Sequence, residues 1–212
     1  TADVVLHLAA QVAVTTSVTD PRTDFDINAL GTFNVLEAVR ASTKKPIMIY
    51  ASTNKVYGSL EHLSVIEEEK RYSLGGGLRA VDENQMLDFH SPYGCSKGAA
   101  DQYVRDYSRL YGLQTVVFRQ SCIYGHRQLG IEDQGWVAWF MIAAMFKRPV
   151  TLYGNGKQVR DLLFVDDLVE AYVQAVAHID KCSGQVYNLG GGPENALSLM
   201  EFFSILEKDF GQ

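Results

Sequence analysis

Three short apolar segments, separated by longer amphipathic stretches, constrain the fold of this chain more than any other feature. Residues 3–9 (DVVLHLA), 47–52 (IMIYAS) and 114–120 (QTVVFRQ) are largely apolar and rich in β-branched side chains. Such runs are typical of strands that are buried on both faces of a parallel sheet. Because helical patterns fill the stretches between them, the sequence predicts an α/β fold with crossover connections and a doubly wound parallel sheet.

The predicted helices have recognisable boundaries. Asp20 is suited to cap a helix that starts at Pro21, and apolar residues recur at helical spacing after it. A second helix is predicted from Pro92 to Gly112, and further helices over residues 135–146, over residues 166–179 and from Ser198. Residues 150–154 and 185–189 are predicted strands, and residues 59–91 are predicted to be loop with short elements.

The composition argues against several classes of protein. A net charge of −6 and a pI of about 5.3 do not favour binding to the phosphates of a nucleic acid, which requires a basic face. The three cysteines are far apart and form no C-x-x-C motif, which favours reduced thiols in the cytoplasm over a disulfide framework or a zinc site. No apolar run is long enough to span a membrane, and no leader is recognised, so we expect a cytoplasmic protein with no membrane partner.

Residues 90–103 (HSPYGCSKGAADQY) allow two different chemical interpretations. The segment GCSKG matches G-x-S-x-G, which would make Ser96 the nucleophile of a hydrolase. Alternatively, Tyr93 and Lys97 lie one helical turn apart, as a base and its cationic partner. A nucleophile elbow needs a strand that runs into the serine, but Pro92 interrupts this segment. The sequence therefore favours Tyr93, with Ser96 on the helix surface or in its first turn.

The residues around Tyr93 support its role as a base. A tyrosine with an unperturbed pKa of about 10 is a poor base at neutral pH, and we expect the ammonium group of Lys97 to lower the pKa of Tyr93. Ser52 and Thr53 stand where the second predicted strand ends. Ligands of a doubly wound sheet bind at that edge, so a hydroxyl group is available there to orient a substrate.

Several segments resemble the extended short-chain dehydrogenase/reductase family, which includes the NAD-dependent epimerases and dehydratases. The similar segments, which extend over essentially the whole chain, are LHLAAQ, INALGTFNVLEA, SPYGCSK and YGNGKQVRDLLFVDDLVEA. The resemblance implies a Rossmann-like fold with a smaller substrate-binding lobe, NAD as cofactor and a nucleotide-sugar substrate. More narrowly, ASTNKVYG, FRQSCIYG and GIEDQGWVAWFMIAA resemble epimerases of this family that invert carbon 2 of a CDP-linked deoxysugar.

The resemblance also implies roles for individual residues. Tyr93 would remove a proton from a sugar hydroxyl, Lys97 would hold the nicotinamide ribose, and Thr53 would bond to the reacting oxygen. The implied catalytic residues are therefore Thr53, Tyr93 and Lys97. The implied cofactor-binding residues are Ala9, Ala10, Gln11, Asn28, Ser52, Tyr93, Lys97 and Gln120. The implied substrate-binding residues are Thr53, Asn54, Cys122, Trp136 and Arg160, and no metal site is expected.

Alternatives remain at some of these positions. The 4,6-dehydratases of the family carry an acid pair after the threonine, whereas this chain has Asn54 and Lys55, which disfavours dehydration. Cys122 replaces an asparagine of many relatives, which leaves the sugar contacts open. Arg160 would meet the substrate pyrophosphate, but an exposed ion pair with the neighbouring aspartate is its alternative. Asn28 could instead lie on a helix surface, and the two alanines could serve packing alone.

The predicted organisation is that of a piece of a longer protein. Residues 1–125 are predicted to be the later part of an NAD-binding domain, because the glycine-rich turn of the family is missing. Residues 126–212 are predicted to be a mixed substrate-binding region. Within this region, the assignment of residues 161–179 and 185–189 to the substrate-binding region or to the main domain is left open. A non-catalytic fragment or binding module is the rival function. Helices over residues 24–41 and 94–110 carry apolar residues beyond one face, as in the paired helices of the family, so we expect a homodimer or homotetramer.

Overall fold

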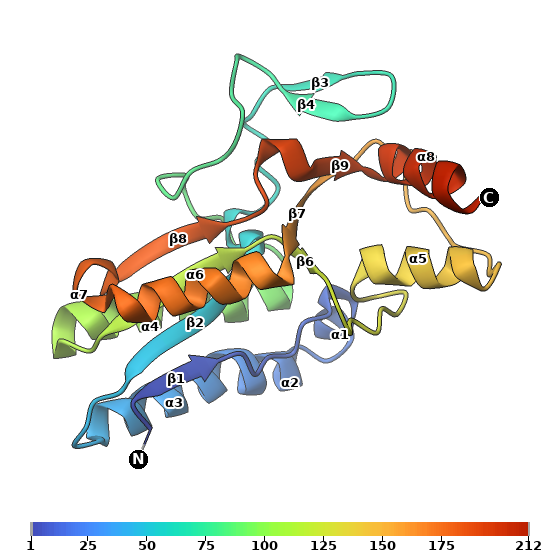
Figure 1. Cartoon of the computed structure of the whole chain (residues 1–212). Helices are drawn as coiled ribbons and strands as arrows, with labels where there is room; N and C mark the ends of the chain where they lie inside the picture. Colours follow the sequence, from blue (N-terminus) through green and yellow to red (C-terminus); the bar gives the residue numbers. More distant parts are fainter. Residues whose placement is uncertain (1, 212) are drawn as a thin grey trace. The chain divides into compact units, whose positions relative to one another are not determined.

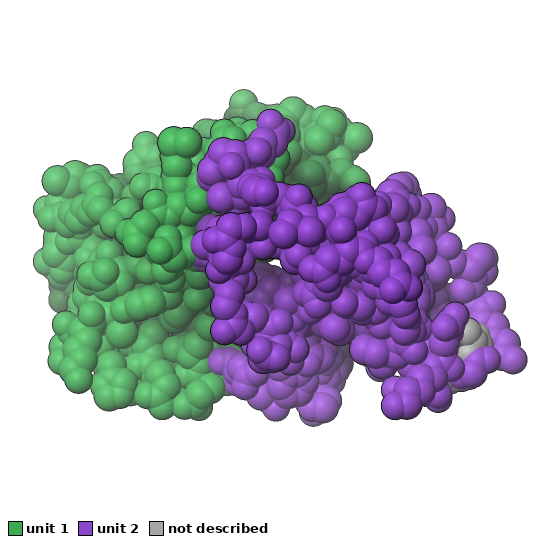
Figure 2. Space-filling view, turned by 90° about the horizontal axis from the view of Figure 1, so that it is seen from above, with its two compact units in different colours: residues 1–59, 82–120, 168–189 green, residues 60–81, 121–167, 190–212 purple. Residues whose placement is uncertain are grey.

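The computed structural model describes residues 2–211, which fall into two units (Figures 1 and 2). Unit 1 consists of Thr1–Ser59, Asp82–Gln120 and Leu168–Leu189. Unit 2 consists of Leu60–Val81, Ser121–Asp167 and Gly190–Gln212. Each unit has its own strands and its own helices.

A parallel sheet of four strands organises unit 1 (Figure 1). The strands are β1 (Val4–His7), β2 (Ile47–Thr53), β5 (Thr115–Gln120) and β8 (Gln185–Leu189), and their order in the sheet is β1-β2-β5-β8. All three pairings are parallel. This arrangement confirms the predicted α/β class with a parallel sheet.

Strand β1 is less buried than predicted. Leu6 and Leu8 are 49% and 54% exposed, whereas the central residues of β2 and all of β5 are buried. His7, which points to the opposite face from Leu6, is buried, so one face of this strand is covered and the other is largely open. The prediction that this strand is covered on both faces is therefore wrong for residues 3–9.

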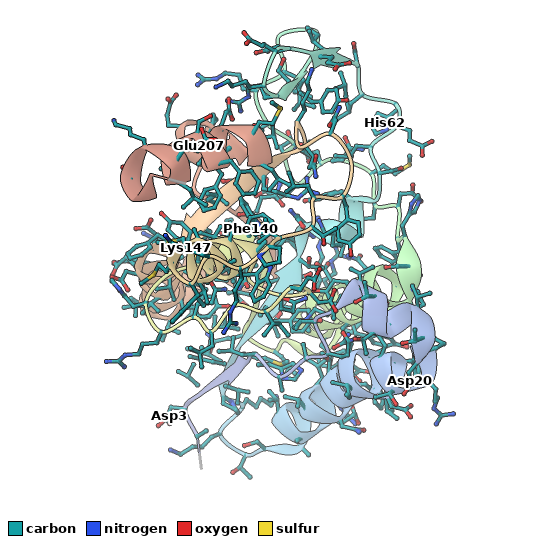
Figure 3. All side chains as sticks on the ribbon, turned by 90° about the vertical axis from the view of Figure 1, so that its right-hand side faces the viewer. Asp3, Asp20, His62, Phe140, Lys147 and Glu207 are labelled. Atoms are coloured by element: carbon teal, nitrogen blue, oxygen red, sulfur yellow. The ribbon has the colours of Figure 1, made fainter. Side chains whose placement is uncertain are left out.

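The first helical region of unit 1 starts where the sequence predicts. After α1 (Val14–Thr19), Asp20 accepts a hydrogen bond of 3.0 Å from the amide of Thr23 and so caps α2 (Pro21–Phe25) (Figure 3). The helix continues without a break as a π-helical turn, η1 (Asp26–Leu30), and then as α3 (Gly31–Ala41). Such π-helical turns are rare and are often found at functional sites.

Helix α4 (Ser91–Tyr111) is the longest in the described chain and ends as predicted. Gly112 follows it with a φ of 65°, in the left-handed conformation that glycine adopts without strain. A second glycine, Gly98, is required by a close approach, because a Cβ atom there would lie 2.4 Å from the ring of Phe89. Phe89, in the loop before α4, can therefore pack directly on the helix backbone at Gly98.

Both faces of the sheet in unit 1 are covered by helices, as a doubly wound fold requires. Val117 packs in the core cluster with Leu36 of α3 and Val104 of α4. The next residue of the strand, Phe118, stacks on Tyr172 of α6 (Val165–Ala177), with ring centroids 5.5 Å apart. Because adjacent residues of a strand point to opposite faces, these helices lie on opposite sides of the sheet. The short α7 (Ile179–Cys182) leads into β8.

Unit 2 contains two small sheets. Strands β3 (Val65–Glu67) and β4 (Tyr72–Leu74) form an antiparallel hairpin. The second sheet has the order β6-β7-β9, with β6 (Cys122–Tyr124), β7 (Val159–Phe164) and β9 (Ala196–Ser198). A short 3₁₀-helix, η3 (Pro193–Asn195), precedes β9, and its counterpart in unit 1, η2 (Asn54–Tyr57), follows β2.

Two helices of unit 2 enclose an aromatic cluster. Helices α5 (Trp136–Met145) and α8 (Leu199–Phe210) pack together, and the rings of Phe140 and Phe203 lie 5.2 Å apart (Figure 3). Ser198 caps α8 with a capping box, so this helix begins where the sequence predicts.

The predicted strand over residues 150–154 is absent, and these residues are irregular. Leu152 and Tyr153 are largely exposed, and Gly154 takes a φ of +85°, which ends any extended segment. The apolar side chains that suggested a strand therefore have no sheet to cover. In the residues that the structure describes, none of the helices has the length and apolar character needed to cross a membrane.

Candidate active site

The ends of two central strands of unit 1 bring hydroxyl and amide groups together. Strands β2 and β5 are in register, so that Thr53 is paired with Gln120 and Ser52 with Arg119. All four side chains are buried. Because a doubly wound sheet binds its ligands beyond the carboxyl ends of its strands, this edge is where the sequence-predicted catalytic residues should meet.

Tyr93 does meet Thr53 at this edge. Pro92 stands in the first turn of α4, and the phenol of Tyr93 is buried close to the side chain of Thr53. Burial raises the pKa of Tyr93 above its ordinary value, the side chain of Thr53 lowers it, and the negative charge of Asp24 raises it. The pKa of Tyr93 is therefore raised overall and not lowered as expected, because removal of the phenol from water has the largest effect.

Lys97 lies one turn further along α4 and points toward strand β2. Its Nζ donates a hydrogen bond of 2.6 Å to the carbonyl oxygen of Ala51 and lies 4.4 Å from the centroid of the Tyr50 ring. Burial lowers the pKa of Lys97 to about 8, although the negative charges of Asp101 and Asp24 act in the opposite direction. Two N–H donors of the ammonium group remain for a ligand at this edge.

Ser96 does not lie on the helix surface. Its side chain is buried, and its Oγ donates to Oδ2 of Asp24 at 2.5 Å and lies 3.2 Å from the carbonyl oxygen of Tyr93. A nucleophilic serine must leave its hydroxyl free for a substrate. The bond to Asp24 therefore argues against the hydrolase interpretation and also corrects the predicted surface position.

Asn28 connects the first helical region to the loop after β1. Its Oδ1 accepts from the amide of Gln11 at 2.9 Å, and its Nδ2 donates to the carbonyl oxygen of the same residue at 3.0 Å. The side chain is 1% exposed, which excludes the surface alternative. Two bonds to one residue's backbone fix the path of the loop, in which Ala9 is exposed and Ala10 is half-buried.

Ser52 belongs to a buried polar network behind the strand ends. Its hydroxyl donates to Asp101 at 2.7 Å, and the same carboxyl group binds the guanidinium of Arg119 with two contacts of 3.0 Å. Arg119 also donates to the hydroxyl of Tyr57 at 2.9 Å, and Tyr57 bonds to Asn188 of β8 at 2.7 Å. This network ties β2, β5, β8 and α4 together directly behind Thr53.

The remaining predicted site residues of unit 1 are Gln120, Asn54 and Gln11. The Nε2 of Gln120 donates to the hydroxyl of Tyr172 on α6, so this end of the Gln120 side chain is already engaged. Asn54 starts η2 and is half-buried. The Oε1 of Gln11, by contrast, is buried without a hydrogen-bond partner in the structure, so this atom has an unmet acceptor.

The remaining predicted substrate-binding residues belong to unit 2. Cys122 lies in β6 and is half-buried. Trp136 packs on Phe202 at 5.2 Å, and its buried Nε1 has no partner in the structure. Arg160 lies in β7 with its Nη1 bonded to the carbonyl oxygen of Val159. Asp161 accepts instead from the amides of Gly191 and Gly192, so the alternative ion pair is not what engages this carboxyl group.

A family model for the NAD dependent epimerase/dehydratase family matches residues 1–190. The chain belongs to this family. The order of the strands, the buried Tyr93 and Lys97 and the hydroxyl of Thr53 agree with the resemblance seen in the sequence. The predicted Rossmann-like class is thereby confirmed.

Individual members of the epimerase/dehydratase family are similar over almost the whole chain. The chain is 51% identical over 210 residues to CDP-paratose 2-epimerase of Salmonella typhi, and the match covers 97% of this chain and 62% of that protein. It is 32% identical over 209 residues to a putative UDP-glucose 4-epimerase of Methanocaldococcus jannaschii, covering 99% of this chain and 61% of that protein. The chain thus spans about three fifths of the length of these relatives.

A solved structure of the epimerase/dehydratase family shares the fold. The UDP-glucose 4-epimerase of Thermus thermophilus, described as a complex with NAD, matches with a TM-score of 0.79 and 32% identity. The match covers 99% of this chain and 62% of that chain.

Sequence reasoning missed several buried charged residues that lie beside the predicted catalytic residues. Asp101 and Asp24 were not singled out, although each stands four residues from a predicted site residue, Lys97 and Asn28 respectively, and so shares its helical face. Arg119 was not singled out either, although a charged residue inside a buried strand requires a counter-charge. The helical spacing of the two aspartates and the charge of Arg119 within an apolar strand were the signals that the sequence offered for these residues.

Proposed function

We propose that the protein to which this chain belongs is an NAD-dependent nucleotide-sugar epimerase that interconverts CDP-paratose and CDP-tyvelose at carbon 2. The observation that carries the proposal is the 51% identity, over 97% of the chain, to a protein named CDP-paratose 2-epimerase. Another sugar-nucleotide epimerase of the family is the nearest alternative, and a cytoplasmic location follows as an expectation from the reduced cysteines.

Tyr93 is the proton-transfer group in this proposal. Its phenol is buried close to Thr53, so a sugar hydroxyl that enters beside Thr53 comes within reach of the same oxygen. Tyr93 takes the hydroxyl proton when the substrate is oxidised to a keto sugar and returns it when the sugar is reduced. Thr53 orients the reacting oxygen through its hydroxyl.

The residues of unit 1 fit a nicotinamide dinucleotide. Lys97 has two free N–H donors for ribose hydroxyls, and the buried Oε1 of Gln11 has an unmet acceptor that a carboxamide or ribose hydroxyl would satisfy. Asn28 fixes the loop that carries Gln11, and Ser52 is held by Asp101 behind the same edge. When bound, NAD supplies a hydride acceptor and donor, so the reaction needs no net oxidant.

Dehydration is not supported by the residues after Thr53. Asn54 and Lys55 provide an amide and an ammonium group at the start of η2, whereas loss of water requires a carboxylic acid and its conjugate base. The chain therefore lacks, at these positions, the acid pair that a 4,6-dehydratase of the family uses.

We also propose a division of labour and an assembly. In this proposal the cofactor-binding residues belong to unit 1, and the substrate-binding residues Cys122, Trp136 and Arg160 belong to unit 2. Exposed apolar side chains on the helices of unit 1, which support a homodimer or homotetramer, are Val18, Phe25, Leu30, Tyr103 and Leu110.

Isotope labelling of the substrate tests the reaction class. CDP-paratose with deuterium at carbon 2 is incubated with the full-length protein, and the product is analysed by NMR and mass spectrometry. We expect CDP-tyvelose with the label still at carbon 2 and no accumulation of reduced nicotinamide absorbance. Retention follows because the hydrogen that leaves carbon 2 returns to carbon 2.

Each rival gives a different product in the same experiment. A dehydratase yields a keto sugar lighter by one water molecule, and a simple dehydrogenase accumulates reduced nicotinamide in proportion to substrate. Exchange of the label with solvent indicates deprotonation at carbon and rules out hydride return. A full-length protein with no turnover of CDP-paratose, but with turnover of a UDP-linked sugar, assigns the activity to another epimerase of the family.

A further inference from the structure

Asp24 is a buried acidic residue for which the proposed reaction has no role. It stands in α2, and its side chain is inaccessible to solvent. Its Oδ2 accepts from Ser96 at 2.5 Å, and its Oδ1 accepts from the Nδ2 of Asn28 at 3.1 Å. A carboxyl group removed from water at this depth is costly unless its bonds or its charge are needed there.

The two partners of Asp24 come from different elements of unit 1. Asn28 lies in the π-helical turn that follows α2, and it holds the backbone of Gln11 with two bonds. Ser96 lies directly between Tyr93 and Lys97 on α4. One carboxyl group thus joins the loop after β1 to the part of α4 that carries the proton-transfer residue.

Charge is the second property of Asp24 at this position. Its negative charge raises the pKa of Lys97 against the effect of burial, and it raises the pKa of Tyr93 in the same direction as burial. The groups that surround the ammonium of Lys97 come from β1, β2, α2 and α4, and Asp101 is itself paired with Arg119 of β5. They are His7, Tyr50, Asp24 and Asp101.

Asp24 and Asp101 differ in the charge of their hydrogen-bond partners. Arg119 binds both oxygens of Asp101, so most of the charge of that carboxyl group is already compensated. The partners of Asp24 are a hydroxyl and an amide, which are neutral. The charge of Asp24 therefore has no cationic partner of its own among these bonds, although Asp101 has the larger effect on the pKa of Lys97.

We propose that Asp24 is a positioning residue of this site, whose buried carboxyl group holds Asn28 and Ser96 in place and supplies a negative charge to the site that contains Lys97. The inference rests on the proposed function, since it assigns Lys97 to the cofactor ribose. It extends that function because it adds a charged group outside the tyrosine, lysine and threonine set.

Removal of the charge alone is feasible at this position. In Asp24→Asn, the remaining carbonyl oxygen can accept from Asn28, and the new amide nitrogen can donate to the Oγ of Ser96. The hydroxyl of Ser96 can then turn to the carbonyl oxygen of Tyr93, which lies 3.2 Å away. Ser96→Ala is the matched control, because it removes a bond of the clamp and keeps the charge.

The experiment compares Asp24→Asn, Ser96→Ala and wild type in the full-length protein. The Kd for NAD, measured by calorimetry from neutral to alkaline pH, reports on Lys97 without any substrate. In the wild type we expect affinity to fall as pH rises through about 8, where Lys97 loses its proton. Asp24→Asn should move this fall to lower pH, because the cation has lost a favourable charge, and Ser96→Ala should leave its midpoint unchanged.

The pH dependence of kcat gives an independent readout. Loss of a negative charge lowers the pKa values of both Tyr93 and Lys97, so both limbs of the profile should move to lower pH in Asp24→Asn. An equal shift in Ser96→Ala would assign the effect to the clamp's geometry and overturn the role of charge. Unchanged midpoints in Asp24→Asn for both NAD binding and kcat would overturn the proposal outright.

Two further outcomes are informative. Asp24→Ser, a smaller uncharged replacement, must shift the NAD midpoint in the same direction, and loss of folding in both Asp24 variants would make this residue structural and refute a positioning role. If wild type binds NAD but does not epimerise CDP-paratose, the proposed substrate fails while the calorimetric comparison still decides the role of Asp24.

Discussion

Asp101 binds the guanidinium of Arg119 through both of its oxygens, at 3.0 Å each, and the two side chains are 0% and 2% exposed. The pair joins α4 to β5 in a region from which water is excluded. Such a pair is poor evidence for net stability, but removal of one partner leaves an uncompensated buried charge. The strand ends that carry Ser52 and Thr53 therefore depend on this pair remaining intact.

We predict that Asp101→Ala or Arg119→Ala lowers the free energy of unfolding of the full-length protein by about 3–5 kcal/mol. Lys44→Ala, which breaks the exposed ion pair with Asp3, is the control and should cost less than about 1 kcal/mol. Urea unfolding measures both changes in unfolding free energy, for variants whose m-value equals that of the wild type. If the double change Asp101→Leu with Arg119→Met costs as much as the two single changes combined, the pair is not coupled as described.

We predict that Tyr93→Phe abolishes epimerisation and leaves the fold intact, because only one hydroxyl, close to Thr53, is removed. Ser96→Ala should keep activity within a few-fold while it lowers stability by about 1–3 kcal/mol, since Asp24 loses a buried donor. Product formation and thermal unfolding are measured on both variants. An inactive serine variant beside an active tyrosine variant would restore the hydrolase interpretation of residues 94–98.

We predict that His7 makes the protein less stable under mildly acidic conditions. Burial and the positive charge of Lys97 lower the pKa of His7 below its ordinary value of 6.5. The unfolded chain therefore binds the proton first, so stability is full above pH 6.5 and declines as the pH falls toward the lower folded-state value. The difference in unfolding free energy between wild type and His7→Gln should shrink over this window.

The comparison with His7→Gln isolates the contribution of His7, because the two proteins are identical at every other position. The Nε2 of His7 lies 2.9 Å from Oγ1 of Thr32, whose hydroxyl donates to the carbonyl oxygen of Asn28, so the imidazole nitrogen is the donor. A difference that does not vary with pH would show that His7 titrates alike in both states.

We predict that Phe25→Glu with Tyr103→Glu converts the full-length protein to a smaller assembly, since both rings are about half exposed on helices of unit 1. Leu129→Glu is the control, because Leu129 is exposed in a loop of unit 2 and should not affect assembly. Light scattering at micromolar concentration measures the mass. A wild-type protein that is already monomeric would contradict the predicted homodimer or homotetramer.

Much of this protein was determined by local patterns in its sequence. Asp20 with Pro21, Gly112 and Ser198 mark helix boundaries because capping involves only neighbouring residues. The parallel sheet followed from the alternation of apolar segments with helices. The spacing of Tyr93 and Lys97 predicted a shared helical face, and the structure places both residues in buried positions on α4.

Tertiary structure alone decided the properties that depend on residues distant in the chain. The pKa of Tyr93 is raised and not lowered, because burial depends on every element packed around the phenol. Ser96 is hydrogen-bonded to Asp24, which is 72 positions away in the sequence, and Arg119 is paired with Asp101 on another element. A one-dimensional pattern records which side chains are polar, but desolvation and charge pairing are set by distances in three dimensions. The effect of the Asp24 charge on Lys97 likewise depends on the folded structure and could not be predicted from the sequence.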